Sequence, residues 1–364
     1  MSIETDHRHM QCALQLAQRG EFTARPNPMV GCVIAQGDDV VGEGWHQRAG
    51  EPHAEVFALR AAGERAQGAT AYVTLEPCGL HGRTPPCADA LIAAKIARVV
   101  IASEDVFQKQ GGALARLRAA GIAVESGLLR DEARELNRGF FSRIERGRPW
   151  LRVKLAMSLD GRTALANGDS RWITGEAARA DVQLWRACSG AILTGSGTVL
   201  ADDPRLTLRL PEGTEAAPLL RVVLDRTLRT PKGANVLDGS APTLMLHGVH
   251  VVPDDRFSNV ECMAVETDAN GISLEPALRL LATRGINEVQ VEAGAKLSGA
   301  LLAQGLVDEV LLYVAPMLLG DAAQPLFALP TISDMASRWP LHLMEEARIG
   351  PDWRLLLRPG RRDG

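Results

Sequence analysis

In the first 120 residues, short apolar runs typical of strands alternate with segments whose apolar residues have the spacing or composition of helices. Short apolar runs predict strands at 30–35, 40–45, 71–75 and 99–102. Segments of helical spacing or composition predict helices at 11–19, 54–66, 88–97 and 114–120. The sequence QGDD between the first two strands indicates a hairpin turn. Strands that alternate with helices predict a sheet covered by helices.

The segment 142–149 is charged, contains Gly147 and Pro149, and lacks apolar periodicity, so we expect a domain boundary there. Beyond it the alternation resumes. Strands are predicted at 150–156, 191–194, 220–224, 243–246, 288–292 and 309–314, and helices at 176–187, 274–283 and 297–304. The pattern predicts two α/β domains, residues 1–146 and 147–364.

Composition narrows the class of protein. The chain has 364 residues, of which 46% are hydrophobic and 23% charged, which is typical of a globular protein with room for two cores. Its net charge of -4 argues against a general nucleic-acid binder. No apolar run approaches the ~20 residues that span a bilayer, and the polar N-terminus has no signal-peptide core. We therefore expect a cytoplasmic protein that binds neither nucleic acid nor membrane.

Four residues of the first half have the types and order of a zinc site. His53, Cys78 and Cys87 offer one imidazole and two thiolates, which leaves a fourth position open as in catalytic zinc sites. His53 and Cys87 precede predicted helices, whose N-termini favour thiolate over thiol. Zinc lowers the pKa of a bound water toward ~7. Glu55, two residues past the histidine, is placed to take that proton and pass it to a leaving amine.

The order H-x-E, then P-C, then a second cysteine is typical of zinc nucleobase deaminases. Here eight residues separate Cys78 from Cys87, whereas the nucleic-acid editors have two. A structural zinc site, or a set of core residues, remains the alternative interpretation. The other cysteines have no partners at ligand spacing, and we expect them to be small apolar residues: Cys12, Cys32, Cys188 and Cys262.

Three motifs carry a resemblance to a known family. RPNPMVGCV (25–33), GWHQRAGEPHAE (44–55) and TLEPCGLHGRTPPC (74–87) resemble the bifunctional deaminase/reductase of riboflavin biosynthesis. The resemblance implies a cytidine-deaminase-like three-layer domain, with a pyrimidine ribonucleotide as the substrate. It also implies that Asn27 contacts the base and that His46 and Arg83 contact phosphate or ribose.

The sequence departs from that family after Val100. The stretch SEDVFQKQGG (103–112) keeps Asp105 as a substrate-binding residue, but Val106 and Phe107 replace a proline and a substrate-contacting asparagine. We expect the zinc chemistry to survive this change, and substrate affinity or preference to be affected.

A dinucleotide-binding Rossmann fold is not expected in the second half. Gly195 and Gly197 follow a strand, but Leu200 stands where the third glycine of that fingerprint belongs. The turn from Glu292 to Gly299 is a better phosphate site, because a strand ends there and a helix begins.

The second half also resembles that family, in KLAMSLDGRTA (154–164), DSRWITG (169–175), TGSGTVLADDPRLTLR (194–209) and VEAGAKLSGALL (291–302). The resemblance implies a dihydrofolate-reductase-like domain that uses NADPH. The implied cofactor contacts are Ala156, Trp172, Thr198, Asp202, Gly294, Ala295, Lys296, Leu297, Ser298, Gly299 and Ala300. The implied substrate contacts are Ser170, Arg186, Leu206, Arg209 and Glu292. Each arginine could instead form a surface salt bridge, and Trp172 could be a core residue.

The leading hypothesis is hydrolytic deamination of 2,5-diamino-6-(5-phosphoribosylamino)pyrimidin-4-one with zinc, followed by NADPH-dependent reduction of the ribosyl group to ribityl. Two alternatives stay open. One is a zinc deaminase with another substrate, such as cytidine, guanine or a tRNA base. The other is a reductase whose deaminase half has a changed substrate preference or has become a binding module. We expect small-molecule substrates and a homo-oligomer.

Overall fold

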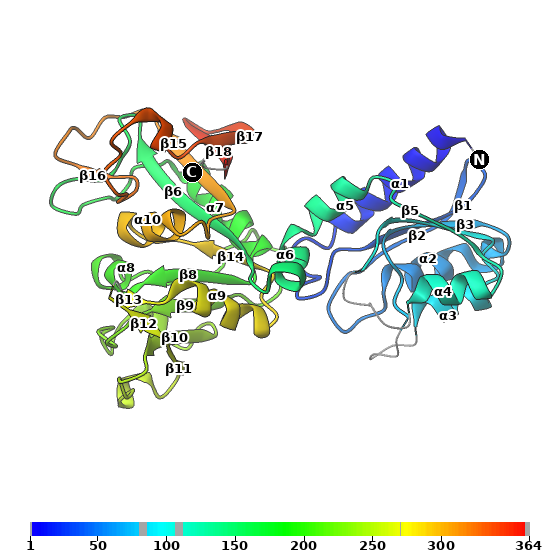
Figure 1. Ribbon diagram of the computed structural model, residues 1–364, viewed down its shortest axis with the longest axis horizontal. Coiled ribbons are helices and arrows are strands. Elements are labelled where there is room, and N and C mark those ends of the chain that lie inside the picture. Colours follow the sequence, from blue (N-terminus) through cyan, green and yellow to red (C-terminus); the bar gives the residue numbers. More distant parts are fainter. Residues whose placement is uncertain (1, 80–85, 106–111, 270, 361–364) are drawn as a thin grey trace. The chain divides into compact units, whose positions relative to one another are not determined.

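The computed structural model describes residues 2–79, 86–105, 112–269 and 271–360 (Figure 1). The chain forms two compact units. One comprises the residues up to Arg146 together with Glu215–Ala217, and the other comprises the rest from Gly147 onward. Among the described residues, no helix is both long and apolar enough to cross a membrane. Each unit is described by itself.

The first unit is a five-stranded sheet with helices on both faces. The strand order is β2-β1-β3-β4-β5, in which β1 runs antiparallel to β2 and β3, and β3, β4 and β5 are parallel. The strands are β1 (Gly31–Gln36), β2 (Asp39–Trp45), β3 (Thr70–Leu75), β4 (Arg98–Ser103) and β5 (Ala123–Ser126). The predicted hairpin is the β1–β2 pair.

Two apolar clusters hold the layers together. One packs α2 (Ala54–Ala62), α3 (Cys87–Ala93) and α4 (Ala113–Ala119) on one face of the sheet. The other packs α1 (Ile3–Gln18) and α5 (Arg130–Leu136) on the opposite face. These three layers match the expected deaminase-like architecture. After α5, the helix α6 (Arg138–Arg146) ends the unit.

The helix α1 begins eight residues earlier than the pattern predicts. Ser2 caps it, because the N–H of Thr5 donates to Ser2 Oγ at 3.2 Å. Its first turns face the sheet with polar residues, and buried Asp6 accepts a hydrogen bond from Tyr72 Oη at 2.6 Å. A search for apolar periodicity misses such a face. The helix α6, which was not predicted, runs to Arg146 through part of the charged segment 142–149.

Glycines let α2 lie directly on β2. A Cβ atom on Gly44 would stand 2.4 Å from the carbonyl oxygen of Ala54, and one on Gly42 would stand 2.2 Å from that of Ala58. Both glycines therefore permit a main-chain approach that no other residue allows. This contact fixes the start of α2, where His53 and Glu55 lie.

The second unit contains a nine-stranded sheet of order β11-β10-β9-β8-β14-β6-β15-β18-β17. Neighbouring strands from β11 to β15 in this order are parallel. The strand β18 runs antiparallel to both of its neighbours, β15 and β17. The strands are β6 (Trp150–Ser158), β8 (Ala191–Gly195), β9 (Leu220–Leu224), β10 (Thr243–Gly248), β11 (Glu261–Val265), β14 (Glu288–Val291), β15 (Glu309–Ala315), β17 (Leu341–Ile349) and β18 (Asp352–Pro359). Short pairs form outside it, namely β7 (Arg162–Ala164) with β16 (Gln324–Pro325), and β12 (Thr267–Asp268) with β13 (Gly271–Ile272).

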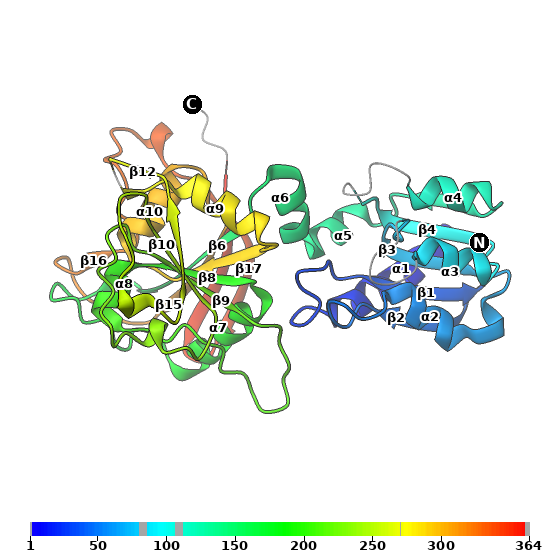
Figure 2. The ribbon, with the colours of Figure 1, turned by 90° about the horizontal axis from the view of Figure 1, so that it is seen from below.

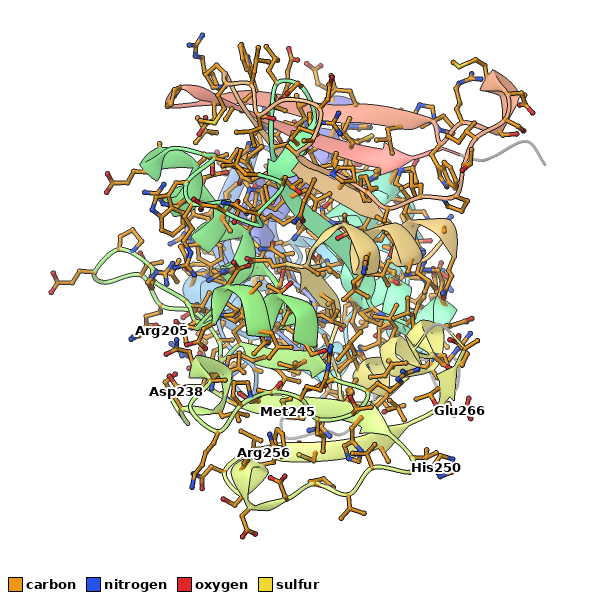
Figure 3. All side chains as sticks on the ribbon, turned by 90° about the vertical axis from the view of Figure 1, so that its left-hand side faces the viewer. Arg205, Asp238, Met245, His250, Arg256 and Glu266 are labelled. Atoms are coloured by element: carbon orange, nitrogen blue, oxygen red, sulfur yellow. The ribbon has the colours of Figure 1, made fainter. Side chains whose placement is uncertain are left out.

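Helices cover both faces of this sheet (Figures 1 and 2). The helices α9 (Leu274–Thr283) and α10 (Ala295–Ala303) pack on one face, and α7 (Glu176–Cys188) packs on the other. The helix α8 (Ser196–Asp202) follows β8. Toward the β11 edge, Met245 of β10 belongs to a further apolar cluster (Figure 3). At this edge Nη1 of buried Arg221 donates to the carbonyl oxygen of Arg205 at 3.2 Å and to Asp238 Oδ1 at 3.0 Å.

The strands β17 and β18 were not predicted. In β17 most side chains are exposed, so its sequence LHLMEEARI does not alternate as a half-buried strand does. Pairing with β18, which itself pairs with β15, makes this segment a strand. Tertiary pairing outweighs local pattern here. Local pattern also missed β5, β7, β11, the short pairs, and the helices α5, α6 and α8.

Candidate functional site

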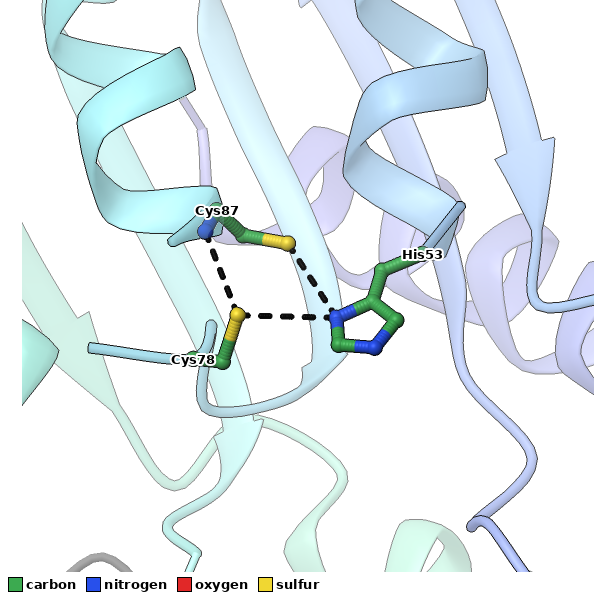
Figure 4. Close-up of side chains that lie close together, drawn as sticks. All are labelled: His53, Cys78 and Cys87. Carbon is green, nitrogen blue, oxygen red and sulfur yellow. Dashed lines mark hydrogen bonds between the residues drawn. The ribbon is translucent and has the colours of Figure 1, made fainter. Parts of the chain in front are cut away.

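The three expected zinc ligands converge in the first unit (Figure 4). His53 is the N-cap of α2, Cys78 follows β3 by three residues, and Cys87 is the first residue of α3. Nδ1 of His53 lies 3.5 Å from Cys78 Sγ and 3.3 Å from Cys87 Sγ. The ligand atoms of all three lie within 4.8 Å of one another.

These atoms fit a zinc ion. Zn–N and Zn–S bonds of about 2.0 and 2.3 Å at tetrahedral angles give an N-to-S separation of about 3.5 Å, close to both observed distances. The N–H of Cys87 also donates to Cys78 Sγ at 3.2 Å. Hydrogen bonding from Cys87 lowers the pKa of the Cys78 thiol, and His53 lowers it further. The surroundings of Cys78 therefore favour the thiolate that zinc requires, whereas the hydrogen bond with Cys78 and burial raise the pKa of Cys87 in the absence of a metal.

Glu55 lies beside this triad in the first turn of α2. Its side chain is buried, and Oε2 has no hydrogen-bond partner among the described residues. Burial raises the pKa of this carboxyl group. A buried carboxylate oxygen without a partner is costly unless it has a ligand to meet, so its position fits proton transfer at the metal.

Asn27 and His46 are brought together next to the triad. The rings of His46 and His53 have centroids 5.4 Å apart. Nδ1 of His46 lies 3.2 Å from the carbonyl oxygen of Pro52, so this nitrogen carries the proton and Nε2 accepts from the Asn27 amide at 3.0 Å. Burial lowers the pKa of His46, which keeps the ring neutral. Both ring nitrogens are thus engaged, and His46 orients the amide of Asn27.

One further predicted contact, Asp105, lies near the zinc ligands. Asp105 follows β4 at the same edge of the sheet, and its N–H donates to Glu76 Oε2 at 3.1 Å. Arg83, Val106 and Phe107 lie outside the described residues. Glu76, in the motif TLEPC, was not singled out from the sequence. The sequence feature that could have identified Glu76 is a carboxylate between a predicted strand and a cysteine ligand.

In the second unit, Arg186 and Glu292 form a buried ion pair. Arg186 Nε donates to Glu292 Oε1 at 2.7 Å, and Nη2 donates to Oε2 at 2.8 Å. Nη1 of Arg186 donates to the carbonyl oxygen of Thr207 at 2.8 Å. All of its nitrogens therefore have protein partners, so Arg186 is held in place with its charge largely balanced.

Glu292 is held on further sides. Gln290 Nε2 donates to its Oε1 at 2.9 Å, and Thr194 Oγ1 donates to its carbonyl oxygen at 2.7 Å. Burial alone would raise the pKa of Glu292, but Arg186 and Lys154 outweigh it and hold the pKa at about 2. Lys154, on β6, was quoted within a motif but not singled out. The signal was a second basic residue, two positions after Arg152, inside a predicted strand.

The remaining predicted substrate contacts differ in exposure. The main-chain N–H of Arg209 donates to Gln183 Oε1 at 3.0 Å, while its side chain is exposed. Leu206 is buried in a core cluster, with a left-handed φ of +52°. A substrate would therefore meet the main chain of Leu206 more readily than its side chain. Ser170 is half-buried in the segment before α7.

The expected cofactor residues come from four segments, of which the first three are β6, the segment before α7, and α8. Arg171 Nη2 donates to the carbonyl oxygen of Asp202 at 2.6 Å, which brings the segment of Trp172 beside α8, where Thr198 also lies. Trp172 is 67% exposed and stacks on Arg179, so it is not a core residue. Ala156 lies on β6, near the end of the strand.

The turn at 294–300 begins α10, with Gly294 as an N-cap that makes no side-chain capping bond. The first N–H groups of α10 and exposed Lys296 suit a phosphate. Ser298 and Gly299 are buried in the packing of α10 instead. A Cβ atom on Gly299 would stand 2.2 Å from the carbonyl oxygen of Ala328, so this glycine serves the approach of the segment around Ala328.

Comparison with known proteins bears on both units. Residues 3–103 match the family model described as cytidine and deoxycytidylate deaminase zinc-binding region, and residues 149–355 match the RibD C-terminal domain. Riboflavin biosynthesis protein RibD of Escherichia coli (strain K12) is 48% identical over 360 residues, which cover 95% of this chain and 97% of that protein. The Haemophilus influenzae protein of the same name is 44% identical over 364 residues, 96% of each chain.

Solved structures agree with these relatives. Acinetobacter baumannii RibD, form 1, is 44% identical with a TM-score of 0.93, covering 99% of this chain and 100% of that chain. A deaminase/reductase from Thermotoga maritima is 32% identical with a TM-score of 0.85, covering 98% and 99% of the two chains. The chain belongs to the RibD family, the bifunctional deaminases and reductases of riboflavin biosynthesis.

Proposed function

We propose that residues 1–146 deaminate 2,5-diamino-6-(5-phosphoribosylamino)pyrimidin-4-one at its 2-amino group, and that residues 147–364 reduce the ribosyl group of the product with NADPH. One observation carries the first step: an imidazole nitrogen and two cysteine sulfurs converge at zinc-ligand distances beside the unpartnered carboxylate oxygen of Glu55. The complete donor set argues against a deaminase half that has become a mere binding module.

In this proposal His53, Cys78 and Cys87 would hold zinc, which would supply an activated water. The Glu55 carboxylate would accept a proton and donate it to the departing amine, as its buried position beside the triad suits. Asn27, oriented by His46, recognises the pyrimidine. Asp105 binds the substrate from the end of β4, and Arg83 is assigned to its phosphate by resemblance alone.

For the reduction, NADPH supplies the hydride when bound. The N-terminus of α10, with Lys296, receives a cofactor phosphate, and Ala156, Trp172, Thr198 and Asp202 line the same site. The Arg186–Glu292 pair, with Lys154 beside it, presents its charges to the ribosyl group, and exposed Arg209 binds the phosphate of the substrate. In a hydride transfer the cofactor carries the chemistry, and the protein contributes positioning and electrostatics.

The test is Glu55→Gln, which keeps the shape of the side chain and removes its proton transfer. We expect ammonia release to fall by roughly 10²- to 10⁴-fold. Zinc content and NADPH oxidation with the deaminated intermediate should stay at wild-type levels. A folded, zinc-loaded variant that still releases ammonia at the wild-type rate contradicts the role of Glu55. Loss of both activities contradicts the assignment of separate sites.

We also propose a homo-oligomer located in the cytoplasm. The edge strand β17 exposes Leu341, Leu343 and Met344, with exposed fractions of 39%, 53% and 51%, and such an edge favours pairing with another chain. A site built on two thiolates suits a reducing compartment. Sedimentation velocity checks the oligomer, and a monomer at micromolar concentration would contradict it.

A further inference from the structure

A buried carboxylate joins the ends of two neighbouring strands beside the zinc ligands. Glu76 directly follows β3, two residues before Cys78, and is 9% exposed. Its N–H donates to the carbonyl oxygen of Ser103 at 2.9 Å, at the end of β4. Its Oε2 then accepts from the N–H of Asp105 at 3.1 Å. The main chain and the side chain of Glu76 thus both hydrogen-bond to the chain where β4 ends.

The same carboxylate reaches the start of α4. The N–H of Leu114 also hydrogen-bonds to Glu76, and a Cβ atom on Gly112 would lie 3.5 Å from Glu76 Oε1. One turn along α4, Arg116 Nη1 donates to the carbonyl oxygen of Gly79 at 2.6 Å. Two side chains, Glu76 and Arg116, therefore tie the chain around Asp105 and Leu114 to the residues that flank Cys78.

From this arrangement we infer that Glu76 is a positioning residue for deamination, which fixes Asp105 relative to the zinc ligands. The inference rests on the proposed function, in which Asp105 binds the substrate. Asp105 lies two residues beyond the end of β4. The hydrogen bond from its N–H to Glu76 restrains the main chain there, and a misplacement of about 1 Å can cost roughly 10²-fold in rate.

The partners of Glu76 separate this role from support of the metal. Its described hydrogen bonds go to residues 103, 105 and 114, whereas the sulfur of Cys78 receives the N–H of Cys87. Loss of the carboxylate should therefore displace Asp105 and leave the zinc ligands in place. The expected signature is weaker substrate binding with zinc retained.

The experiment is a double-mutant cycle in the full-length zinc protein, with the variants Glu76→Ala, Asp105→Ala and both together. We expect each single variant to raise KM for the diaminopyrimidine ribonucleotide by roughly tenfold or more, with a smaller change in kcat. The double variant should be no worse than Asp105→Ala, because Glu76 acts through that residue. Glu76→Gln keeps one carbonyl oxygen as an acceptor and should fall between Glu76→Ala and the wild type.

Glu104→Gln is the matched control. This neighbouring carboxylate is exposed and accepts from Ser126 Oγ at 3.0 Å, so its loss should leave KM unchanged. Zinc content, melting temperature and NADPH oxidation are measured for every variant.

The outcomes are distinct. Loss of zinc in Glu76→Ala, or effects of the two single variants that multiply in the double variant, overturns the positioning role in favour of a structural one. An unchanged KM in Glu76→Ala, with an active wild type, overturns the inference alone. A zinc-loaded wild type that releases no ammonia overturns the proposed function, and the role of Glu76 with it.

Discussion

At the scale of single residues, both sites consist of side chains whose hydrogen bonds are largely made within the protein. His46 holds the Asn27 amide with Nε2 and the carbonyl oxygen of Pro52 with Nδ1, and Arg186 uses its nitrogens on Glu292 and Thr207. Side chains with so many protein hydrogen bonds have their orientation fixed before the substrate binds. Preorganised groups of this kind need little rearrangement during the reaction.

The buried pair predicts a pH dependence of stability in the second unit. Glu292 has a pKa of about 2 in the folded protein against an ordinary value of 4.5. Its contribution, about 3 kcal/mol, is complete above pH 4.5 and is lost as the pH falls from there toward 2, because the unfolded chain takes up the proton first. Glu292→Gln should therefore unfold at a lower temperature than the wild type at pH 6, and the difference should shrink toward pH 3.

Calorimetry over that pH range makes the measurement. Glu275→Gln is the control, because Glu275 is exposed and pairs with Arg279 one turn away on α9. A difference between wild type and Glu292→Gln that stays constant from pH 6 to 3 would contradict the low pKa.

The types and order of the metal-site residues were predictable, because zinc accepts few donors and needs them at short range. Their surroundings were not. The hydrogen bonds of Glu76 join residues 29 and 38 positions apart in the sequence, and the role of Lys154 depends on Glu292, which is far along the chain. Such partners become visible only when strands pair.

At the scale of elements, the contact of α2 with β2 sets the metal site. The N-cap of α2 is a ligand, and its first turn carries Glu55, so any shift of this helix moves both. The apolar pattern predicted α2 and β2 correctly, because both elements bury one side. It did not reveal that Gly42 and Gly44 bring the two main chains together.

Gly44→Ala should weaken zinc binding. The new Cβ atom would stand 2.4 Å from the carbonyl oxygen of Ala54 and 2.6 Å from the nitrogen of Ala58, so α2 must move outward. We expect the affinity for zinc to fall by roughly tenfold or more, as measured by competition with a chromophoric chelator. The control is Gly121→Ala, which strains a turn with φ of +82° but has no atom within 4 Å. If both variants bind zinc as the wild type does, this packing does not set the metal site.

At the scale of the whole molecule, each unit has its own sheet and its own apolar clusters. The two-domain organisation was readable from the renewed alternation of strands after residue 150. The extent of the second sheet was not, because β17 and β18 depend on pairing with β15 rather than on local pattern.

Removal of zinc should therefore affect the units unequally. Because a ligand stabilises only the unit that binds it, a chelator should lower the melting temperature of the first unit and abolish ammonia release. NADPH oxidation with the deaminated intermediate, and the unfolding of the second unit, should stay unchanged. Scanning calorimetry with and without chelator tests this, and a joint shift of both transitions would show that the units unfold together.

The division of labour around the metal has a consequence for how this protein can change over generations. The ligands are carried by the N-termini of α2 and α3 and by the end of β3, whereas Asp105 stands beyond the end of β4. Mutations after β4 can therefore alter which substrate binds while the metal ligands and Glu55 stay unchanged. A new substrate preference could therefore arise in this family through changes after β4, without the metal site having to be rebuilt.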